Sequence, residues 1–112
     1  DWLISPSISL AGKTGVKMIF REAMNFATNI NDEAKAFVST NYAGSGDPNE
    51  ADWTQLTGFT RSAGNSWTFV DTGEINLSAY DGQTIYVAFK YTSTTAVAGT
   101  WEISRMLLTA SN

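Results

Sequence analysis

The residues best suited to ligand chemistry lie in and around one long polar stretch, residues 41–52. Two aromatic residues, Tyr42 and Trp53, lie at its ends, and the apolar face of an aromatic ring complements the C–H face of a sugar. Loops of about a dozen residues are uncommon in compact domains and are often functional. Four side chains between the two rings offer carboxylate or amide oxygens to sugar hydroxyls: Asp47, Asn49, Glu50 and Asp52. We take these six residues as a candidate glycan-binding site.

The competing interpretation of these aromatic residues is structural. Aromatic side chains in small sandwiches are mostly buried, so Trp53 would pack beneath its own loop and the acidic residues would simply be solvated. The argument is stronger for Trp2, Trp67 and Trp101, which lie in strand-like runs with apolar neighbours. We expect these three tryptophans in the core, and we expect Trp67→Ala to destabilise the domain as a core truncation does.

Two stretches, residues 29–33 and 47–52, carry the oxygen-bearing side chains that calcium requires. Calcium takes about six to eight oxygen ligands, which irregular loops often supply. Neither stretch has the regular spacing of an EF-hand loop, and Asn and Asp are also ordinary turn residues. The turn interpretation is favoured, and calcium stays an open alternative as the one cofactor under consideration.

The chain has no cysteine and no histidine. It therefore has no disulfide framework and no thiolate metal site, and it contains no serine–histidine or cysteine–histidine nucleophile. Paired carboxylates, as in glycosidases, could come from the 11 acidic residues, but no pattern pairs any two of them. Glu22 and Glu102 lie in apolar runs, where burial would raise a carboxyl pKa. We expect rim positions for both, or pairing with Arg21 or Arg105, and we predict a non-enzymatic domain.

Charge and length restrict the classes of partner. The net charge is −4, and the seven basic residues are scattered singly. Binding to nucleic acid requires clustered cations that displace phosphate counterions, so no nucleic-acid partner is predicted. No apolar run approaches membrane-spanning length, so this chain is not expected to insert into a membrane. A chain of 112 residues suffices for one domain with its own core.

Short alternating runs predict an all-β fold. Period-two patterns predict strands at residues 2–10, 16–26, 34–38, 53–56 and 84–92, and further strand runs follow residue 66. Pro6 has no N–H to donate, so the first run should lie at a sheet edge or be broken there. Residues 25–32 have loop composition, and helix is the competing assignment for residues 32–38. About seven short strands separated by turns predict a β-sandwich of two antiparallel sheets.

The last third of the chain, residues 67–109, has the strongest strand signals. Residues 84–92 alternate cleanly, follow an Asp-Gly turn and predict the central strand. In the final run the apolar parity changes at residues 104–105, which predicts a β-bulge or burial on both faces. The residues on the two parities are Trp101 and Ile103, then Met106 and Leu108.

The run Trp2-Leu3-Ile4-Ser5-Pro6-Ser7-Ile8-Ser9-Leu10 resembles the opening of choice-of-anchor J and cleaved-adhesin domains. The similarity continues through residues 38–42, 44–48 and 52–56, and it ends at Gly99-Thr100-Trp101-Glu102-Ile103. It is densest at residues 67–70, 75–80 and 85–92. The resemblance implies a jelly-roll β-sandwich, similar to galactose-binding domains and carbohydrate-binding modules, in secreted or surface-anchored bacterial proteins.

The same resemblance implies that residues 1–112 form a single domain that lacks an N-terminal strand of the full family domain. Some relatives carry structural calcium, and the family often follows Trp-Glu-Ile with Asp-Asn. This chain has Ser104 and Arg105 there, so a cation site that uses that aspartate is not expected.

From these motifs and the missing catalytic residue types, we expect a non-catalytic extracellular module that binds glycan or mediates adhesion. The expected location is secreted or at the cell surface, associated with the outer membrane. The expected partners are a glycan or a host or cell-surface protein, and other domains of a larger parent protein. The alternative is a structural spacer or assembly domain without a small-molecule ligand. A carbohydrate-active enzyme is the least favoured hypothesis.

Overall fold

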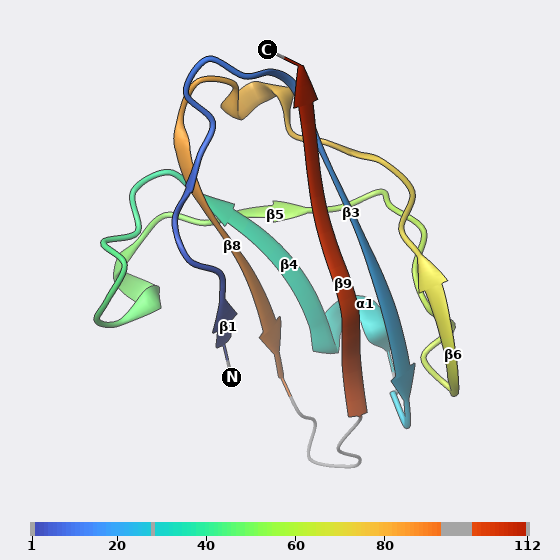
Figure 1. The fold of residues 1–112 in the computed structure, drawn as a ribbon. Helices are drawn as coiled ribbons and strands as arrows, with labels where there is room; N and C mark the ends of the chain where they lie inside the picture. The colour runs from blue at the N-terminus through green and yellow to red at the C-terminus, as the bar shows by residue number, and fades with distance from the viewer. Residues whose placement is uncertain (1, 28, 93–99, 112) are drawn as a thin grey trace.

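Two antiparallel sheets lie face to face in the computed structural model, which describes residues 2–27, 29–92 and 100–111 (Figure 1). Gly99, the first residue of the last family-like motif, lies outside these ranges. The architecture confirms the predicted all-β sandwich. One sheet holds, in spatial order, β1 (Trp2–Ile4), β8 (Thr84–Tyr91), β4 (Ala34–Ser39) and β5 (Thr54–Leu56), and β2 (Ile8–Ser9) also pairs with β8.

The second sheet is built around β3 (Thr14–Asn25). Two strands, β6 (Ser66–Asp71) and β7 (Ile75–Asn76), pair with successive parts of β3, and β9 (Thr100–Ser111) pairs along its whole length. Figure 1 shows β9, β3 and β6 side by side as this layer of the sandwich. We call this the four-stranded sheet, and the one that contains β8 the five-stranded sheet.

The core lies between the inner faces of the two sheets. Phe20 of β3 meets Phe89 of β8 with ring centroids 5.1 Å apart in an edge-to-face arrangement. Inward-facing residues alternate along both strands, as period-two patterning requires. The other buried apolar members of this cluster are Leu10, Val16, Met18, Ala36, Val38, Ile75, Leu77, Ile85 and Val87. Burial of this apolar surface is the main stabilising contribution to the fold.

Two details of the strand prediction are confirmed. β8 is central, with β1 and β2 on one side and β4 on the other. The first run is broken at Pro6: β1 ends at Ile4, and β2 begins at Ile8. The ladder continues as far as Ser5, whose N–H donates to the Val87 carbonyl at 2.8 Å.

The predicted irregularity at residues 104–105 is a β-bulge. Arg105 lies opposite Arg21, but Ile103 rather than Ser104 lies opposite the next residue of β3, Glu22. Ser104 is therefore the extra residue. It resets the parity of β9, so that apolar side chains on both sides of the bulge pack against the core: Trp101, Ile103, Met106 and Leu108.

The predicted loop over residues 25–32 needs a correction, because Ile30–Glu33 form a single helical turn, α1, directly before β4. Asn29 caps it: its side chain accepts from the Asn31 N–H at 3.0 Å, and its own N–H donates to Glu33 Oε2 at 2.6 Å. The residues that suggested a turn thus start a helix. Two 3-10 turns, η1 (Pro48–Glu50) and η2 (Ser78–Tyr80), complete the described helices, none of which is long and apolar enough to cross a membrane.

The predicted core position of Trp67 is wrong. Its side chain is 50% exposed on the outer face of β6, whereas Trp101 packs against the core from β9. Apolar side chains occur on both parities here, Trp67 and Phe69 on one and Val70 on the other, so alternation could not choose the inner face. Trp67 shares its parity with Asp71, which forms an exposed ion pair with Arg21 on the outer face.

Truncation of one residue from each environment tests this placement. Leu77→Ala removes a fully buried side chain and should lower the free energy of unfolding by roughly 2–5 kcal/mol. Trp67→Ala should lower it by about 1 kcal/mol or less, since the ring is largely solvated. Urea unfolding followed by circular dichroism measures both, and an equal loss in the two variants would contradict the exposed position.

Candidate functional site

Five aromatic rings lie in sequence across the outer face of the five-stranded sheet, and we call them the aromatic row. They are Trp2 of β1, Phe37 of β4, Tyr86 of β8, and Tyr42 and Trp53 at the two ends of the long loop. Ring centroids are 5.6 Å apart for Trp2–Phe37, 5.2 Å for Trp2–Trp53, 5.5 Å for Trp53–Tyr42 and 5.0 Å for Tyr42–Tyr86. These distances allow direct ring contact. All five residues are half-buried.

Strand pairing places the row on the outer face. Phe37 and Tyr86 alternate with the buried residues Val38 and Val87, which point to the core. A cation joins the row beside Trp2, because Lys90 lies opposite Trp2 in the register and its Nζ is 5.0 Å from the indole centroid. A cation at this distance from an indole face is attracted by the ring quadrupole.

The long loop folds onto this face. The Trp53 Nε1–H donates to the Pro48 carbonyl at 2.8 Å, and the Tyr42 N–H donates to Ser39 Oγ at 3.1 Å. At Gly44 the backbone passes directly over Tyr86: a Cβ built there would lie 2.8 Å from the Tyr86 hydroxyl oxygen. These contacts fix how Tyr42 and Trp53 sit relative to the sheet.

The four polar residues predicted for the site are all exposed on this loop. Two of them also hold it together. Asp47 Oδ1 accepts from the Asn49 N–H at 2.9 Å, and Asp52 exchanges two hydrogen bonds with Asn41 at 2.9 and 3.0 Å. No hydrogen bond from the Glu50 side chain to another described residue is present, so its carboxylate remains accessible.

The structure therefore brings Tyr42 and Trp53 into contact, and it combines the two interpretations of Trp53. The ring packs against its own loop, as the structural alternative requires, and it also belongs to a larger aromatic surface. The predicted core position of Trp2 is wrong, since Trp2 lies in this row on the outer face of the sheet. Sequence reasoning also missed Phe37 and Tyr86 as members of that surface. The sequence indicates the strand parity of Phe37 and Tyr86. It does not indicate which face of the sheet stays uncovered.

Neither stretch considered for calcium forms an acidic cluster in the structure. Over residues 2–27, 29–92 and 100–111, no group of three or more His, Cys, Asp or Glu side chains is placed to hold a metal ion. Asn29 and Asp47 instead cap the short helical turns α1 and η1. This arrangement agrees with the turn interpretation of both stretches.

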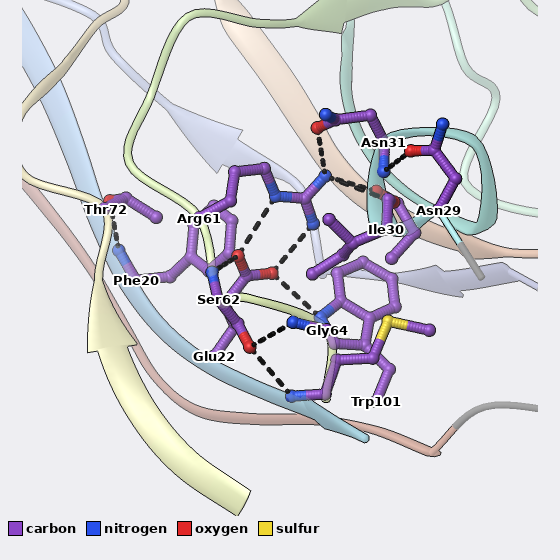
Figure 2. Close-up of polar contacts among 12 residues, drawn as sticks. Phe20, Glu22, Asn29, Ile30, Asn31, Arg61, Ser62, Gly64, Thr72 and Trp101 are labelled. Atoms are coloured by element: carbon purple, nitrogen blue, oxygen red, sulfur yellow. Dashed lines mark hydrogen bonds and ion pairs between the residues drawn. The ribbon is translucent and has the colours of Figure 1, made fainter. Parts of the chain in front are cut away.

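Two acidic residues of the described chain are buried, Glu22 and Glu33, and Figure 2 shows the surroundings of Glu22. The Glu22 carboxylate accepts four hydrogen bonds, two at each oxygen. Arg61 Nη2 and Trp101 Nε1 donate to Oε1 at 2.8 and 3.0 Å, and Arg61 Nε and the Ser62 N–H donate to Oε2 at 3.0 Å. Bidentate pairing with a guanidinium is the geometry that compensates a buried carboxylate best.

Arg61 extends this network to the beginning of β4. Its Nη1 donates to the Ala34 carbonyl at 2.7 Å, next to α1, and its guanidinium carbon lies 5.0 Å from the Phe59 centroid. The expectation that Glu22 lies at a rim or pairs with Arg21 or Arg105 is wrong, since its partner is 39 residues away in a connector. Glu102 is exposed, as a rim position requires. Because both Glu22 oxygens are fully engaged, this carboxylate serves as a structural anchor.

A comparison with models of known protein families finds a match to one family. The model of a family described as a domain of unknown function, DUF5017, matches residues 8–112, which is nearly the whole chain. The chain therefore belongs to this family. The match does not tie it to choice-of-anchor J or cleaved-adhesin domains, so that part of the resemblance stays a prediction. Comparison with curated proteins finds no match.

The buried ion pair generates a stability prediction. Arg61→Ala leaves the Glu22 carboxylate buried without its main partner and should lower the free energy of unfolding by about 3–5 kcal/mol. Arg21→Ala is the matched control, because it removes an exposed pair with Asp71 and should change stability by about 1 kcal/mol or less. Chemical denaturation measures both. A small effect of Arg61→Ala would show that the network is dispensable.

The contact between Gly44 and Tyr86 can be tested with two glycines of the same loop. Gly44 (φ +87°) and Gly46 (φ +83°) share the left-handed region, but only Gly44 is close to another side chain. Both changes to alanine add backbone strain, of the order of 1 kcal/mol. Gly44→Ala should lower the thermal midpoint further, and Tyr86→Phe should restore part of that loss. Equal midpoints for the two alanine variants would exclude the contact.

Proposed function

We propose that this member of the DUF5017 family is a non-catalytic extracellular module that binds glycan through the aromatic row. The proposal includes its place as one domain of a larger secreted or surface-attached bacterial protein, as the resemblance to choice-of-anchor J and cleaved-adhesin domains implies. Adhesion to a host or cell-surface partner would follow from recognition of the glycans that such a surface carries.

The observation that supports this proposal is the continuity of the row. Five rings in contact give a single apolar strip, and the exposed loop beside it carries carboxylate and amide groups. Sugars combine apolar C–H faces with hydroxyl groups, so a receptor needs both kinds of surface next to each other. The loop's hydrogen bonds hold the rings in place before the ligand arrives, which reduces the entropy lost on binding.

Within this site the residues have different roles. Tyr42 and Trp53 would stack against sugar rings next to the loop, and Trp2 would extend the surface to a further ring. Glu50 and Asn49, both exposed, would accept or donate hydrogen bonds to hydroxyls. Asp47 and Asp52 would act mainly through the loop geometry that they stabilise.

A structural or assembly role is the second candidate, and the free edge of β9 supports it. Within the described part of the chain, β9 pairs only with β3, so its other edge carries unpaired backbone groups over 12 residues. An apolar groove lies beside this edge, lined mainly by Leu3, Phe89, Trp101 and Ile103. Unpaired edges of this length readily accept another strand. In that case no glycan would bind, and self-association or assembly with a parent domain would depend on β9.

A glycan array followed by titration calorimetry on the best binder tests the proposal. Tyr42→Ala should weaken binding about tenfold, equivalent to about 1.4 kcal/mol, because it removes a ring from the middle of the row. Lys17→Gln on the opposite sheet is the surface control and should leave this affinity unchanged. Thermal unfolding of each variant shows whether the fold is intact. The proposed site would be excluded if no glycan on the array bound, or if Tyr42→Ala bound the glycan as tightly as the unchanged protein.

A further inference from the structure

The outer face of the four-stranded sheet carries a second set of exposed aromatic and apolar side chains. Among the described residues, four large apolar side chains are exposed, and three of them lie on this face: Phe26 at 56%, Trp67 at 50% and Leu107 at 41%. Phe26 and Trp67 form an edge-to-face pair with centroids 6.1 Å apart. These two side chains are more exposed than any residue of the aromatic row on the other sheet.

The backbone at Phe26 is strained in a way that favours this exposure. Its φ is +62°, and it is the one non-glycine residue in the described chain with a positive φ. A bulky residue in the left-handed region is uncommon, and such strain concentrates at functional sites. The Phe26 N–H donates to Asn25 Oδ1 at 2.9 Å, which holds the turn that directs the ring toward Trp67.

Two arginines form the other half of this surface. Arg21 of β3 and Arg105 of β9 lie directly opposite each other in the register, and like charges in this position repel. Asp71 neutralises Arg21 through an ion pair of 2.7 Å. Arg105 forms no ion pair with any residue that the structure describes. Both arginines line a pocket of about 210 Å³, together with Ile19, Phe20, Asp71 and Leu107.

Phe69 connects the aromatic and cationic ends. The Arg21 guanidinium carbon is 5.8 Å from the Phe69 centroid, and Trp67 lies two residues before Phe69 on β6. Strands rise about 3.3 Å per residue, so Trp67 and the Arg21–Asp71 pair lie about 13 Å apart along β6. Exposed Glu102 lies opposite Ala23 between these ends and can accept hydrogen bonds from hydroxyls.

We propose that this surface binds an acidic oligosaccharide. A sugar ring would stack on the Trp67–Phe26 pair, and a carboxylate or sulfate group on a neighbouring sugar would bind Arg105. An anion there would relieve the repulsion between Arg105 and Arg21, and a guanidinium pairs with carboxylate or sulfate oxygens through two parallel hydrogen bonds. The site is independent of the aromatic row, because it lies on the outer face of the opposite sheet.

Calorimetry with three oligosaccharide probes tests this proposal: trigalacturonic acid, a sulfated heparin tetrasaccharide and neutral maltotriose. One or both acidic probes should bind more tightly than the neutral one, and the two arms distinguish carboxylate from sulfate. Arg105→Gln and Trp67→Ala should each weaken the acidic interaction about tenfold. Lys17→Gln is the matched charge control, since Lys17 is an exposed cation on the same strand as Arg21 and should have no effect. The titrations are repeated in the Tyr42→Ala background, which separates this site from the aromatic row on the other sheet.

Three results would overturn the proposal. The first is equal affinity for acidic and neutral probes. The second is an equal loss in Arg105→Gln and Lys17→Gln, which would indicate attraction by net charge alone. The third is binding of a poly-glutamate peptide without binding of either acidic sugar, which would assign the surface to acidic protein segments. Circular dichroism melts of each variant establish that the fold is retained, and both substituted side chains are exposed in the native structure.

Discussion

The structure depends on how the buried carboxylate of Glu22 is satisfied. Glu22 lies in the second half of β3 and is fully buried, and an uncompensated carboxylate there would strongly destabilise the folded core. Its four hydrogen bonds are supplied by Arg61, Ser62 and Trp101, from segments far apart in the sequence. Through Arg61 the same charge fixes the first residue of β4. Satisfying one carboxylate thus sets how a connector, a helical turn and the three strands β3, β4 and β9 lie relative to one another.

Strand alternation and turn chemistry were sufficient to predict the sandwich. They located β8, the break at Pro6 and the parity change at Ser104, because each depends on local backbone chemistry or on contrast between neighbouring side chains. The same reasoning failed at Trp67, where both parities are apolar. The informative residue there was Asp71, a charge four positions later on the parity of Trp67, which marks that face as the solvent side. The pairing of Glu22 with Arg61 left no local trace, since 39 residues separate the two.

The sequence predicted the loop part of the candidate glycan site but not the strand residues that extend it. Tyr42 and Trp53 flank a polar loop of unusual length, and that is visible in the sequence. Membership of Trp2, Phe37 and Tyr86 depends on which strands are neighbours and on which sheet face lacks a covering layer. Both are properties of the assembled sheet. The orientation of the loop likewise rests on contacts between distant residues, such as Gly44 against Tyr86.

Because of the bulge at Ser104, β9 tolerates a different side chain at this position but not the loss of the residue. Exchanging the Ser104 side chain leaves every neighbour on its present face. Deleting the residue would join two halves of opposite phase, so one half would have to turn its apolar side chains to water and its polar ones to the core. Deleting Ser104 should therefore cost far more stability than exchanging its side chain.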